Sequence, residues 1–311
     1  MSLPRSVVWE LHEALGADTI DPAGSVEVRS LGGGSIHHAA RLETRAGPVF
    51  IKWSPGLAGV GFGSEARSLE ALRCACEDSE ALVVPGVLGY RDSSGELASV
   101  GWLALEYLAP GGDLGDRGFG TRLGRGLAAL HAPLPGLFGW EEDNFIGPLP
   151  QANPTGASWP SFWRDARLAP QLETARSTDL LSQADDAVMD RVLDRTVEML
   201  ESVADEAPVL LHGDLWSGNV LRTDANRAAL IDPSCYRGHR EVDLAMAELF
   251  GGFPDSLHQA YHEFRPLTEG YPEVRRPLYQ LYYLLVHLNL FGAGYLSGCL
   301  AAARTALSHG A

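Results

Sequence analysis

The feature that most constrains this sequence is an ordered set of polar residues between two apolar runs. Val209–Leu211 leads into the octapeptide His-Gly-Asp-Leu-Trp-Ser-Gly-Asn, residues 212–219, and a second apolar run, Ala229–Ile231, ends at Asp232. Short apolar runs bounded by turn residues predict buried strands. We therefore expect a strand, an exposed loop with Asp214 and Asn219, a hairpin, and a strand that ends at Asp232.

Phosphoryl transfer requires these residue types in this order. It needs a base for the acceptor hydroxyl and oxygen ligands for Mg²⁺. The H-x-D-x-x-x-x-N spacing followed by a second Asp matches kinases. In this interpretation Asp214 is the base, Asn219 and Asp232 hold the metal, and His212 orients the loop. An ordinary turn rich in Asp, Gly and Asn is the alternative, but the ordered set favours catalysis.

A glycine-rich run lies between two predicted strands near the N-terminus and consists of Gly32, Gly33, Gly34 and Ser35. It is not a Walker A loop, which needs Gly-Lys-Ser/Thr, and it opens onto a strand rather than the helix of a dinucleotide fold. Kinase-like folds use such a loop to lay backbone N–H groups over ATP phosphates. A plain hairpin turn is the alternative.

One lysine, Lys52, occurs among the 24 basic residues, and the others are arginines. It ends the strand Val-Phe-Ile-Lys, and Glu65 follows near the start of the next helix, with Glu70 as a rival partner. A strand lysine that clamps ATP phosphates needs a carboxylate to hold its ammonium. Since Lys and Arg are not interchangeable, the pattern favours an ATP-binding Lys52–Glu65 pair over a surface ion pair.

Strand signals dominate before residue 110 and helix signals after it. We predict an α+β chain with the two lobes of a protein-kinase-like fold: a small β-rich nucleotide-binding lobe, residues 1–109, and a larger, mainly helical catalytic and substrate lobe, residues 110–311. Ser64 is the expected N-cap of the helix that carries Glu65. Helices are predicted at Val7–Leu15, Ser64–Cys76, Thr121–His131, Trp159–Leu172, Asp186–Ala204, Val242–Phe250, Asp255–Phe264 and Arg275–Phe291.

The sequence also resembles the fructosamine kinase (ketosamine-3-kinase) family, which belongs with the aminoglycoside and choline kinases. The resemblance covers nearly the whole chain. Its segments include D-L-W-S-G-N at 214–219, G-H-R-E-V-D-L-A at 238–245, G-P-V-F-I-K at 47–52, L-E-Y-L at 105–108, F-G-W at 138–140, D-N-F-I-G at 143–147 and R-L-A-P-Q-L at 167–172.

This resemblance implies ATP-dependent phosphorylation of a sugar hydroxyl on a ketosamine, with ATP and Mg²⁺ as cofactors. It implies that Glu106, Tyr107 and Leu108 form a hinge whose backbone meets adenine, that Trp216 faces the sugar, and that Asp243 braces the catalytic loop. The chain departs from the family at Ser35, where many plant and animal members carry Cys, and at Ser234, Cys235 and Arg237. These departures leave the substrate preference open.

Composition limits the partners. The formal net charge of −16 disfavours nucleic acid and suits a cationic ligand. Four cysteines in a chain of this length do not form a disulfide framework, and no signal-peptide core is apparent, so we expect a reducing cytoplasm. The apolar stretch Leu278–Leu296 is interrupted by Gln, His and Asn, which favours a buried helix over a membrane span.

Two other functions remain open from the sequence. An aminoglycoside or other amino-alcohol kinase would use the same chemistry and also a cationic substrate. A catalytically dead nucleotide-binding scaffold would use the same fold, although every catalytic residue type is present. The sugar, the amine, whether the ketosamine is free or protein-bound, and the oligomeric state are undetermined.

Overall fold

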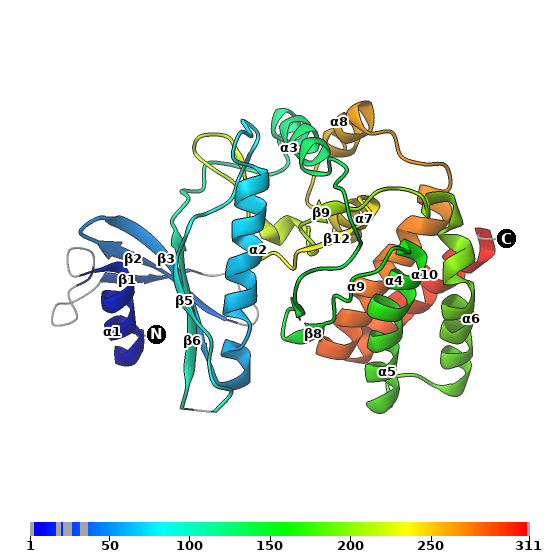
Figure 1. Cartoon of the computed structure of the whole chain (residues 1–311), viewed down its shortest axis with the longest axis horizontal. Helices are drawn as coiled ribbons and strands as arrows, with labels where there is room; N and C mark the ends of the chain where they lie inside the picture. Colours follow the sequence, from blue (N-terminus) through cyan, green and yellow to red (C-terminus); the bar gives the residue numbers. More distant parts are fainter. Residues whose placement is uncertain (1–2, 17–19, 21–26, 32–36, 97, 310–311) are drawn as a thin grey trace. The chain divides into compact units, whose positions relative to one another are not determined.

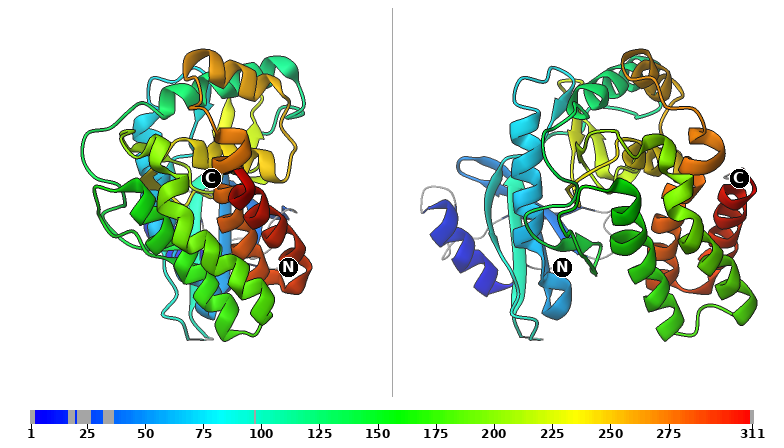
Figure 2. Two further views of the ribbon diagram at one scale, coloured as in Figure 1. Left: turned by 90° about the vertical axis from the view of Figure 1, so that its right-hand side faces the viewer. Right: turned by 45° about the vertical axis from the view of Figure 1, so that its right-hand side comes forward.

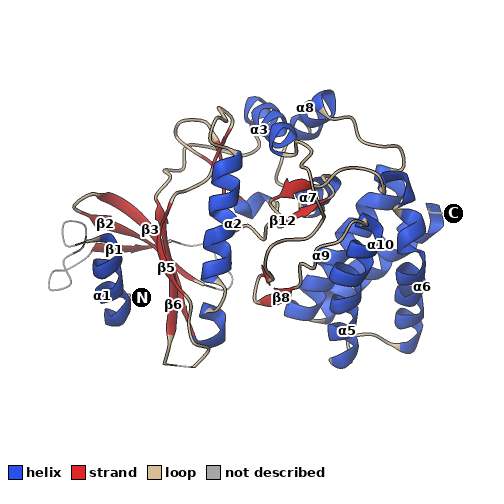
Figure 3. Ribbon diagram, in the orientation of Figure 1, coloured by secondary structure: helices blue, strands red, loops and turns tan. Residues whose placement is uncertain are grey.

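The computed structural model describes residues 3–16, 20, 27–31, 37–96 and 98–309. The chain forms two compact units, drawn in Figure 1. Unit 1 contains Met1–Asp113 and Val220–Pro233, and unit 2 contains Leu114–Asn219 and Ser234–Ala311. Unit 1 is rich in strands and unit 2 in helices (Figure 3), which confirms the predicted α+β class.

Unit 1 is built on an antiparallel five-stranded sheet with the strand order β1-β2-β3-β6-β5. Its elements are α1 (Arg5–Leu15), β1 (Glu27–Ser30), β2 (His38–Thr44), β3 (Gly47–Pro55), η1 (Gly56–Gly59), α2 (Phe62–Ala75), β4 (Leu82–Val83), β5 (Val87–Arg91), β6 (Val100–Glu106), β10 (Val220–Arg222) and β11 (Ala228–Leu230).

Helices α1 and α2 lie on opposite faces of this sheet (Figures 1 and 2). Val7 and Leu11 of α1 are fully buried against alternate strand residues such as Leu42 and Ile51. This alternation is the period-two pattern of a strand with one covered face. Helix α2 covers the other face and carries Glu65.

Helix α2 begins earlier than expected, at Phe62, so the prediction that Ser64 is its N-cap is wrong. The N-cap is Gly61, and Ser64 lies within the first turn, where its hydroxyl donates to the Gly61 carbonyl. The orphan N–H groups of Gly61 and Gly63 are satisfied from a distant segment, because both donate to Asp92 at 3.0 Å.

The segment 220–233 belongs to unit 1, although it follows the catalytic octapeptide in the sequence. Strand β10 pairs antiparallel with β11, and β11 pairs in parallel with β4. The 109/110 boundary expected from the sequence assigned this segment to the C-terminal lobe. The pairing of β10 with β11 is local, so a sequence can indicate it, but the pairing of β11 with β4, 146 residues earlier, has no local signal.

Unit 2 is mainly helical. Its elements are α3 (Arg117–Leu130), β7 (Asn144–Ile146), β8 (Leu149–Gln151), α4 (Trp159–Trp163), η2 (Arg164–Leu168), α5 (Ala169–Ser177), α6 (Gln183–Met199), η3 (Glu201–Val203), β9 (Val209–Leu211), η4 (Ser217–Asn219), β12 (Tyr236–Gly238), α7 (Glu241–Leu249), α8 (Ser256–Phe264), η5 (Tyr271–Arg275), α9 (Arg276–Phe291), η6 (Ala293–Tyr295) and α10 (Leu296–His309).

The apolar stretch near the C-terminus forms α9, which is the buried helix that the sequence predicted. Leu278, Leu281 and Leu285 are fully buried in the unit 2 core. None of the helices in the described ranges has both the length and the apolar character needed to cross a bilayer. The chain then continues into α10, a helix that the sequence pattern did not predict.

Candidate active site

In unit 1, Lys52 forms two ion pairs. Its ammonium lies 2.5 Å from the Glu65 carboxylate on α2 and 2.9 Å from that of Asp232. The Lys52 side chain is buried, whereas that of Asp232 is 48% exposed. The predicted Lys52–Glu65 pair is therefore present, and the rival Glu70 instead pairs with Arg73 on the surface. The direct Lys52–Asp232 contact was not expected from the sequence.

This buried cluster places two carboxylates around one ammonium. Burial alone would lower the pKa of Lys52, but the attraction of Asp232 and Glu65 outweighs it and raises the pKa, so Lys52 stays protonated. Burial raises the pKa of Glu65 to about 7, assisted by repulsion from Asp232 and opposed by Lys52. When both carboxylates are ionised, the cluster of Lys52, Glu65 and Asp232 carries one net negative charge.

The backbone of Asp232 is unusual, with φ at +52° in the left-handed region. Non-glycine residues rarely adopt this conformation, and Asp is among those that do so most often. Such backbone strain tends to occur at functional sites. Asp232 lies two residues after the end of β11 at Leu230, so the turn out of the strand fixes the direction of its carboxylate.

In unit 2, Asp214 and Asn219 contact each other within one loop. The Asn219 amide nitrogen donates to the Asp214 backbone carbonyl at 2.9 Å and to its carboxylate at 3.0 Å. The Asp214 N–H donates to Nδ1 of His212 at 3.2 Å. Strand β9 delivers the loop and the single turn η4 ends at Asn219. Hydrogen bonds within the predicted loop therefore join His212, Asp214 and Asn219.

Asp243, near the start of α7, holds the loop by accepting hydrogen bonds from its backbone. Its carboxylate accepts the N–H groups of His212 at 2.8 Å and Gly213 at 2.9 Å, and it lies 3.2 Å from Nε2 of His131. Burial would raise the pKa of Asp243, but the hydrogen bonds and charges around it, led by His131, lower it overall. Asp243 thus makes the bracing contacts that the resemblance implied.

Gly213 is required at the centre of this loop. Its φ is +82°, and an added Cβ would lie 2.0 Å from the Ser234 carbonyl oxygen. The Gly213 carbonyl accepts a hydrogen bond of 2.7 Å from the buried Tyr283 hydroxyl on α9. A side chain here would break both the turn and its close contact with the Ser234 backbone.

The sequence did not identify His131 or Tyr283. His131 follows the last residue of α3 and Tyr283 lies inside an apolar helix, so their sequence distances from the loop are large. Fully buried polar groups need partners, but only the fold shows which ones. A His at the end of a helix was the one weak sequence signal.

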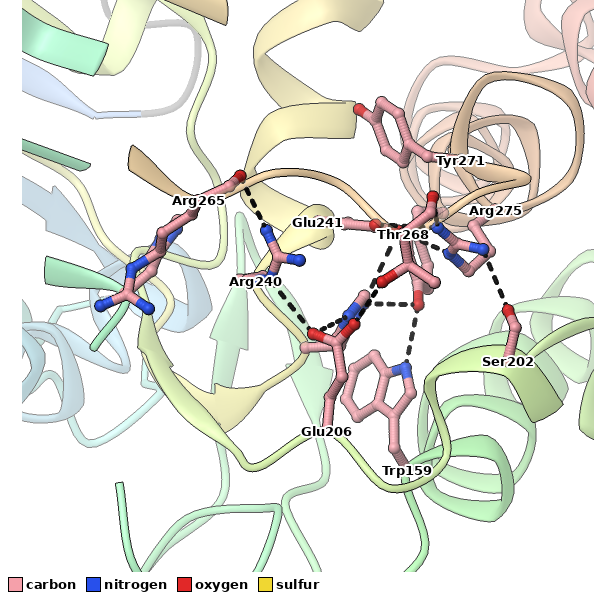
Figure 4. Close-up of polar contacts among 12 residues, drawn as sticks. Trp159, Ser202, Glu206, Arg240, Glu241, Arg265, Thr268, Tyr271 and Arg275 are labelled. Carbon is pink, nitrogen blue, oxygen red and sulfur yellow. Dashed lines mark hydrogen bonds and ion pairs between the residues drawn. The ribbon is translucent and has the colours of Figure 1, made fainter. Parts of the chain in front are cut away.

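A buried polar network anchors the start of α7 (Figure 4). Glu241 accepts two hydrogen bonds from Arg275, at 2.6 and 2.9 Å, and both side chains are buried. Arg275 also donates to the Ser202 hydroxyl, and Glu206 accepts from Arg240. Since Glu241 lies two residues before Asp243, this network fixes the position of the bracing carboxylate.

Of the remaining predicted residues, Trp216 and the hinge residues are described by the structure, and the glycine-rich run is not. Trp216 is half-buried, and its indole lies over Gly218, where an added Cβ would be 2.3 Å from the ring. At the expected hinge, the Glu106 N–H donates to the Gly86 carbonyl, and the Tyr107 ring contacts Arg41. Gly32, Gly33, Gly34 and Ser35 lie outside the described residues.

A dedicated metal cage is not seen. Among the described residues, no group of three or more His, Cys, Asp or Glu side chains is placed to hold a metal ion. Magnesium in kinases commonly binds through one or two protein oxygens together with phosphates and water. The carboxylate of Asp232 and the amide oxygen of Asn219 are the correct donor types for such a site.

Comparisons with known proteins agree on one family. The fructosamine kinase family model matches residues 8–308. A Synechocystis protein named "Probable ketoamine kinase" is 37% identical over 92% of both chains. The chloroplastic protein-ribulosamine 3-kinase of Arabidopsis thaliana is 36% identical over 88% of this chain and 81% of its own.

Solved structures support the same assignment. A candidate fructosamine-3-kinase from Thermobifida fusca is 36% identical with a TM-score of 0.82, over 98% of this chain and 100% of that one. The aminoglycoside phosphotransferase APH(4)-Ia has a TM-score of 0.61 at 19% identity, over 96% and 98% of the two chains, which shows a shared kinase-like fold. This chain, a kinase in sequence and in fold, belongs to the fructosamine kinase family.

Proposed function

We propose that this protein transfers the terminal phosphoryl group of ATP to a sugar hydroxyl of a ketosamine, with Asp214 as the general base. The observation that carries this proposal is the fixed carboxylate of Asp214, which accepts from Asn219 in a loop clamped by Asp243. A base must be held within reach of the proton that it removes. A loop buried and braced in this way meets that requirement.

The other residues have roles in binding ATP. Lys52 would contact the α- and β-phosphates, and Glu65 holds its ammonium in place. The glycine-rich run at residues 32–35 would be the source of backbone N–H groups for the phosphates. Since the Glu106 N–H is already bonded to Gly86, the hinge would meet adenine through the Glu106 carbonyl and the backbone of Tyr107 and Leu108.

The donor set fits magnesium. Asp232 offers a half-exposed carboxylate, and the Asn219 amide directs its nitrogen, not its oxygen, to Asp214. Asp232 and Asn219 would therefore hold Mg²⁺ through oxygen. Bound Mg²⁺ supplies charge neutralisation and orientation of the phosphates. Lys52 would then exchange its contact with Asp232 for the nucleotide.

The names of the relatives support the ketosamine class. They include ketoamine kinases and protein-ribulosamine 3-kinases, and these relatives are aligned over most of both chains. Both fructosamines and ribulosamines, free or attached to proteins, are within the proposed class. Trp216, two residues beyond Asp214, would offer a flat apolar face to the sugar ring.

A substrate screen tests the proposal. Mg·ATP consumption is measured with fructosamines, ribulosamines, aminoglycosides and choline at equal concentration. We expect turnover with a ketosamine, and Asp214→Asn should lower kcat by about 10²–10⁴-fold. Asp205→Asn, an exposed carboxylate of the same unit, is the matched control and should leave kcat unchanged.

A binding measurement separates the alternatives. Thermal stabilisation by Mg·ATP should persist in Asp214→Asn and disappear in Asp232→Ala. Turnover of an aminoglycoside but of no ketosamine would replace the substrate assignment, and stabilisation by ATP without turnover of any acceptor would favour a nucleotide-binding scaffold. Near-normal kcat in Asp214→Asn would remove the base assignment.

A further inference from the structure

Five aromatic rings of unit 2 form a continuous group that begins at the catalytic loop. We call Trp216, Phe250, His287, Phe291 and Tyr295 the aromatic patch. Trp216 lies edge-on to Phe250 with ring centroids 6.3 Å apart, and Phe250 is 4.8 Å from His287. His287 is in turn 5.5 Å from Phe291 and 5.1 Å from Tyr295.

Two rings of the aromatic patch are exposed and three are half-buried, where most aromatic side chains of unit 2 are buried. Phe250 is 41% exposed and Phe291 is 55% exposed, whereas Trp159, Trp163 and Tyr279 have no exposed surface. Single exposed apolar residues are common, but Phe250 and Phe291 are joined through His287 into one partly exposed group, and such groups mark binding surfaces. The outer end of the group is therefore open, and its inner end, Trp216, is two residues from Asp214.

The catalytic loop and the patch are packed against each other. The Trp216 indole lies over Gly218, and an added Cβ at Gly252 would be 2.4 Å from the Ser217 hydroxyl. The residues that follow Phe250 therefore touch the loop that carries Asp214. This packing places the Trp216 and Phe250 end of the patch against the loop that carries Asp214.

His287 provides a hydrogen-bond acceptor atom among the rings of the aromatic patch. Its Nδ1 lies 2.8 Å from the Tyr283 backbone carbonyl, which can only accept, so Nδ1 carries the proton. In the neutral imidazole, Nε2 then holds a lone pair. Burial lowers the pKa of His287, which favours this neutral form at pH 7.

We propose that the aromatic patch binds the protonated amine of the ketosamine substrate, with its sugar directed toward Asp214. Aromatic faces attract ammonium groups through their quadrupoles, and the Nε2 atom of His287 accepts an N–H from the amine. The chain's net charge of −16 favours the same cation. This inference rests on the proposed function and names the part of the substrate that the patch recognises.

The test compares two substrates that differ in one charge. The first is a fructosamine carrying an alkyl group on its protonated nitrogen, and the second is the 1-O-alkyl fructose ether with oxygen in place of that nitrogen. The variants are Phe291→Ala and His287→Ala, with His287→Gln as the variant that retains an acceptor. Phe264→Ala is the matched control, since Phe264 is an exposed ring of the same unit, 61% exposed, outside the patch.

We expect Phe291→Ala to raise the KM for the fructosamine by about 2–5-fold, with kcat and the KM for ATP unchanged. The KM for the ether should change less than twofold in every variant. His287→Ala should also raise the KM for the fructosamine, and His287→Gln should restore part of the loss. Phe264→Ala should behave as wild type.

Several results would overturn this inference. Equal increases of KM for both substrates would show a role in apolar packing only, and an unchanged KM in Phe291→Ala would show that the patch does not touch the amine. Wild-type enzyme that turns over neither ketosamine nor ether would instead contradict the proposed function itself. A fructosamine that wild type phosphorylates no better than the ether would also count against recognition of the amine.

Discussion

At the scale of single residues, Lys52 is placed where its size matters as much as its charge. Its ammonium lies within 2.9 Å of both Glu65 and Asp232 in a buried site. A guanidinium is broader and planar, so it cannot take the same position between two carboxylates. The survival of one lysine in a chain otherwise using arginine has a geometric reason here.

Replacing this lysine by arginine should therefore impair the enzyme although the charge is kept. We expect Lys52→Arg to raise the KM for ATP or lower kcat at least several-fold. Arg73→Lys, in the surface pair with Glu70, is the reciprocal control and should have no effect. Steady-state kinetics with varied ATP measure both, and wild-type constants for Lys52→Arg would leave Lys52 without a special role.

Glu65 should make folding stability depend on pH in an uncommon direction. Its pKa rises from 4.5 to about 7 on folding, so the folded state holds the extra proton between these values. Stability then falls as pH rises through this window and levels off above it. The stability of wild type relative to Glu65→Gln should decrease by on the order of 1–3 kcal/mol from pH 4.5 to 7.

Urea unfolding of both proteins at several pH values measures this difference. A stability difference that is flat or rises across the window would show that Glu65 stays ionised beside Lys52.

The sequence could predict much of the site because its parts are close together in the chain. Asp214 and Asn219 are five residues apart, and the strand–helix order indicated Glu65 over Glu70. His131 and Tyr283 contact the same loop from residues 131 and 283, and no spacing rule connects them to it. Long-range partners of this kind follow from the fold alone.

At the scale of elements, the start of α7 depends on a buried ion pair. Glu241 and Arg275 form two hydrogen bonds with almost no exposure to solvent. Removing one member leaves the other charge buried without its partner, which usually costs roughly 3–5 kcal/mol. Because Asp243 lies in the first turn of the same helix, the catalytic loop depends on this pair.

We expect Arg275→Met and Glu241→Gln each to destabilise the protein by roughly 3–5 kcal/mol, with less loss in the double variant than the sum of the two. Glu198→Gln, in the exposed Arg195 pair of the same unit, should change stability by less than about 1 kcal/mol. Denaturant unfolding checks all four. Additive losses would show that the two charges act independently.

Elements with strong periodicity were predicted better than those with weak signals. Strand β3, which carries the predicted Val-Phe-Ile-Lys run, and α9 appear near their expected positions, because continuously apolar residues mark them. The expected helix Trp159–Leu172 extends to Ser177 through a wide turn, η2. The short strands β7 and β8 were missed, since three residues carry too little pattern.

At the scale of the whole molecule, the chain passes between its two units at the residues proposed to hold the metal. Asn219 is the last residue of one segment of unit 2, and Asp232 lies one residue before unit 1 ends at Pro233. Of the residues with proposed roles, Lys52, Glu65 and Asp232 belong to unit 1, and Asp214 and Asn219 belong to unit 2. A single boundary at residue 110 does not show that the segment Val220–Pro233 belongs to unit 1.

The net charge of −16 gives the last prediction, because it acts on the two substrates in opposite directions. A protonated ketosamine is attracted and Mg·ATP, which is anionic, is repelled. Salt screens both effects, with a Debye length of about 10 Å at 0.1 M. Raising NaCl from about 20 to 300 mM should therefore lower kcat/KM for the ketosamine several-fold, while kcat/KM for Mg·ATP stays level or rises.

The 1-O-alkyl fructose ether serves as the neutral control for this experiment, and its kcat/KM should not change with salt. A parallel fall for ketosamine, ether and Mg·ATP would indicate a general effect of salt on the enzyme. Constant values for the ketosamine would show that the acidic surface serves solubility alone. The two recognition effects differ in range: the field of the acidic surface changes the rate at which substrate and enzyme meet, whereas the aromatic patch contacts the amine only in the bound complex.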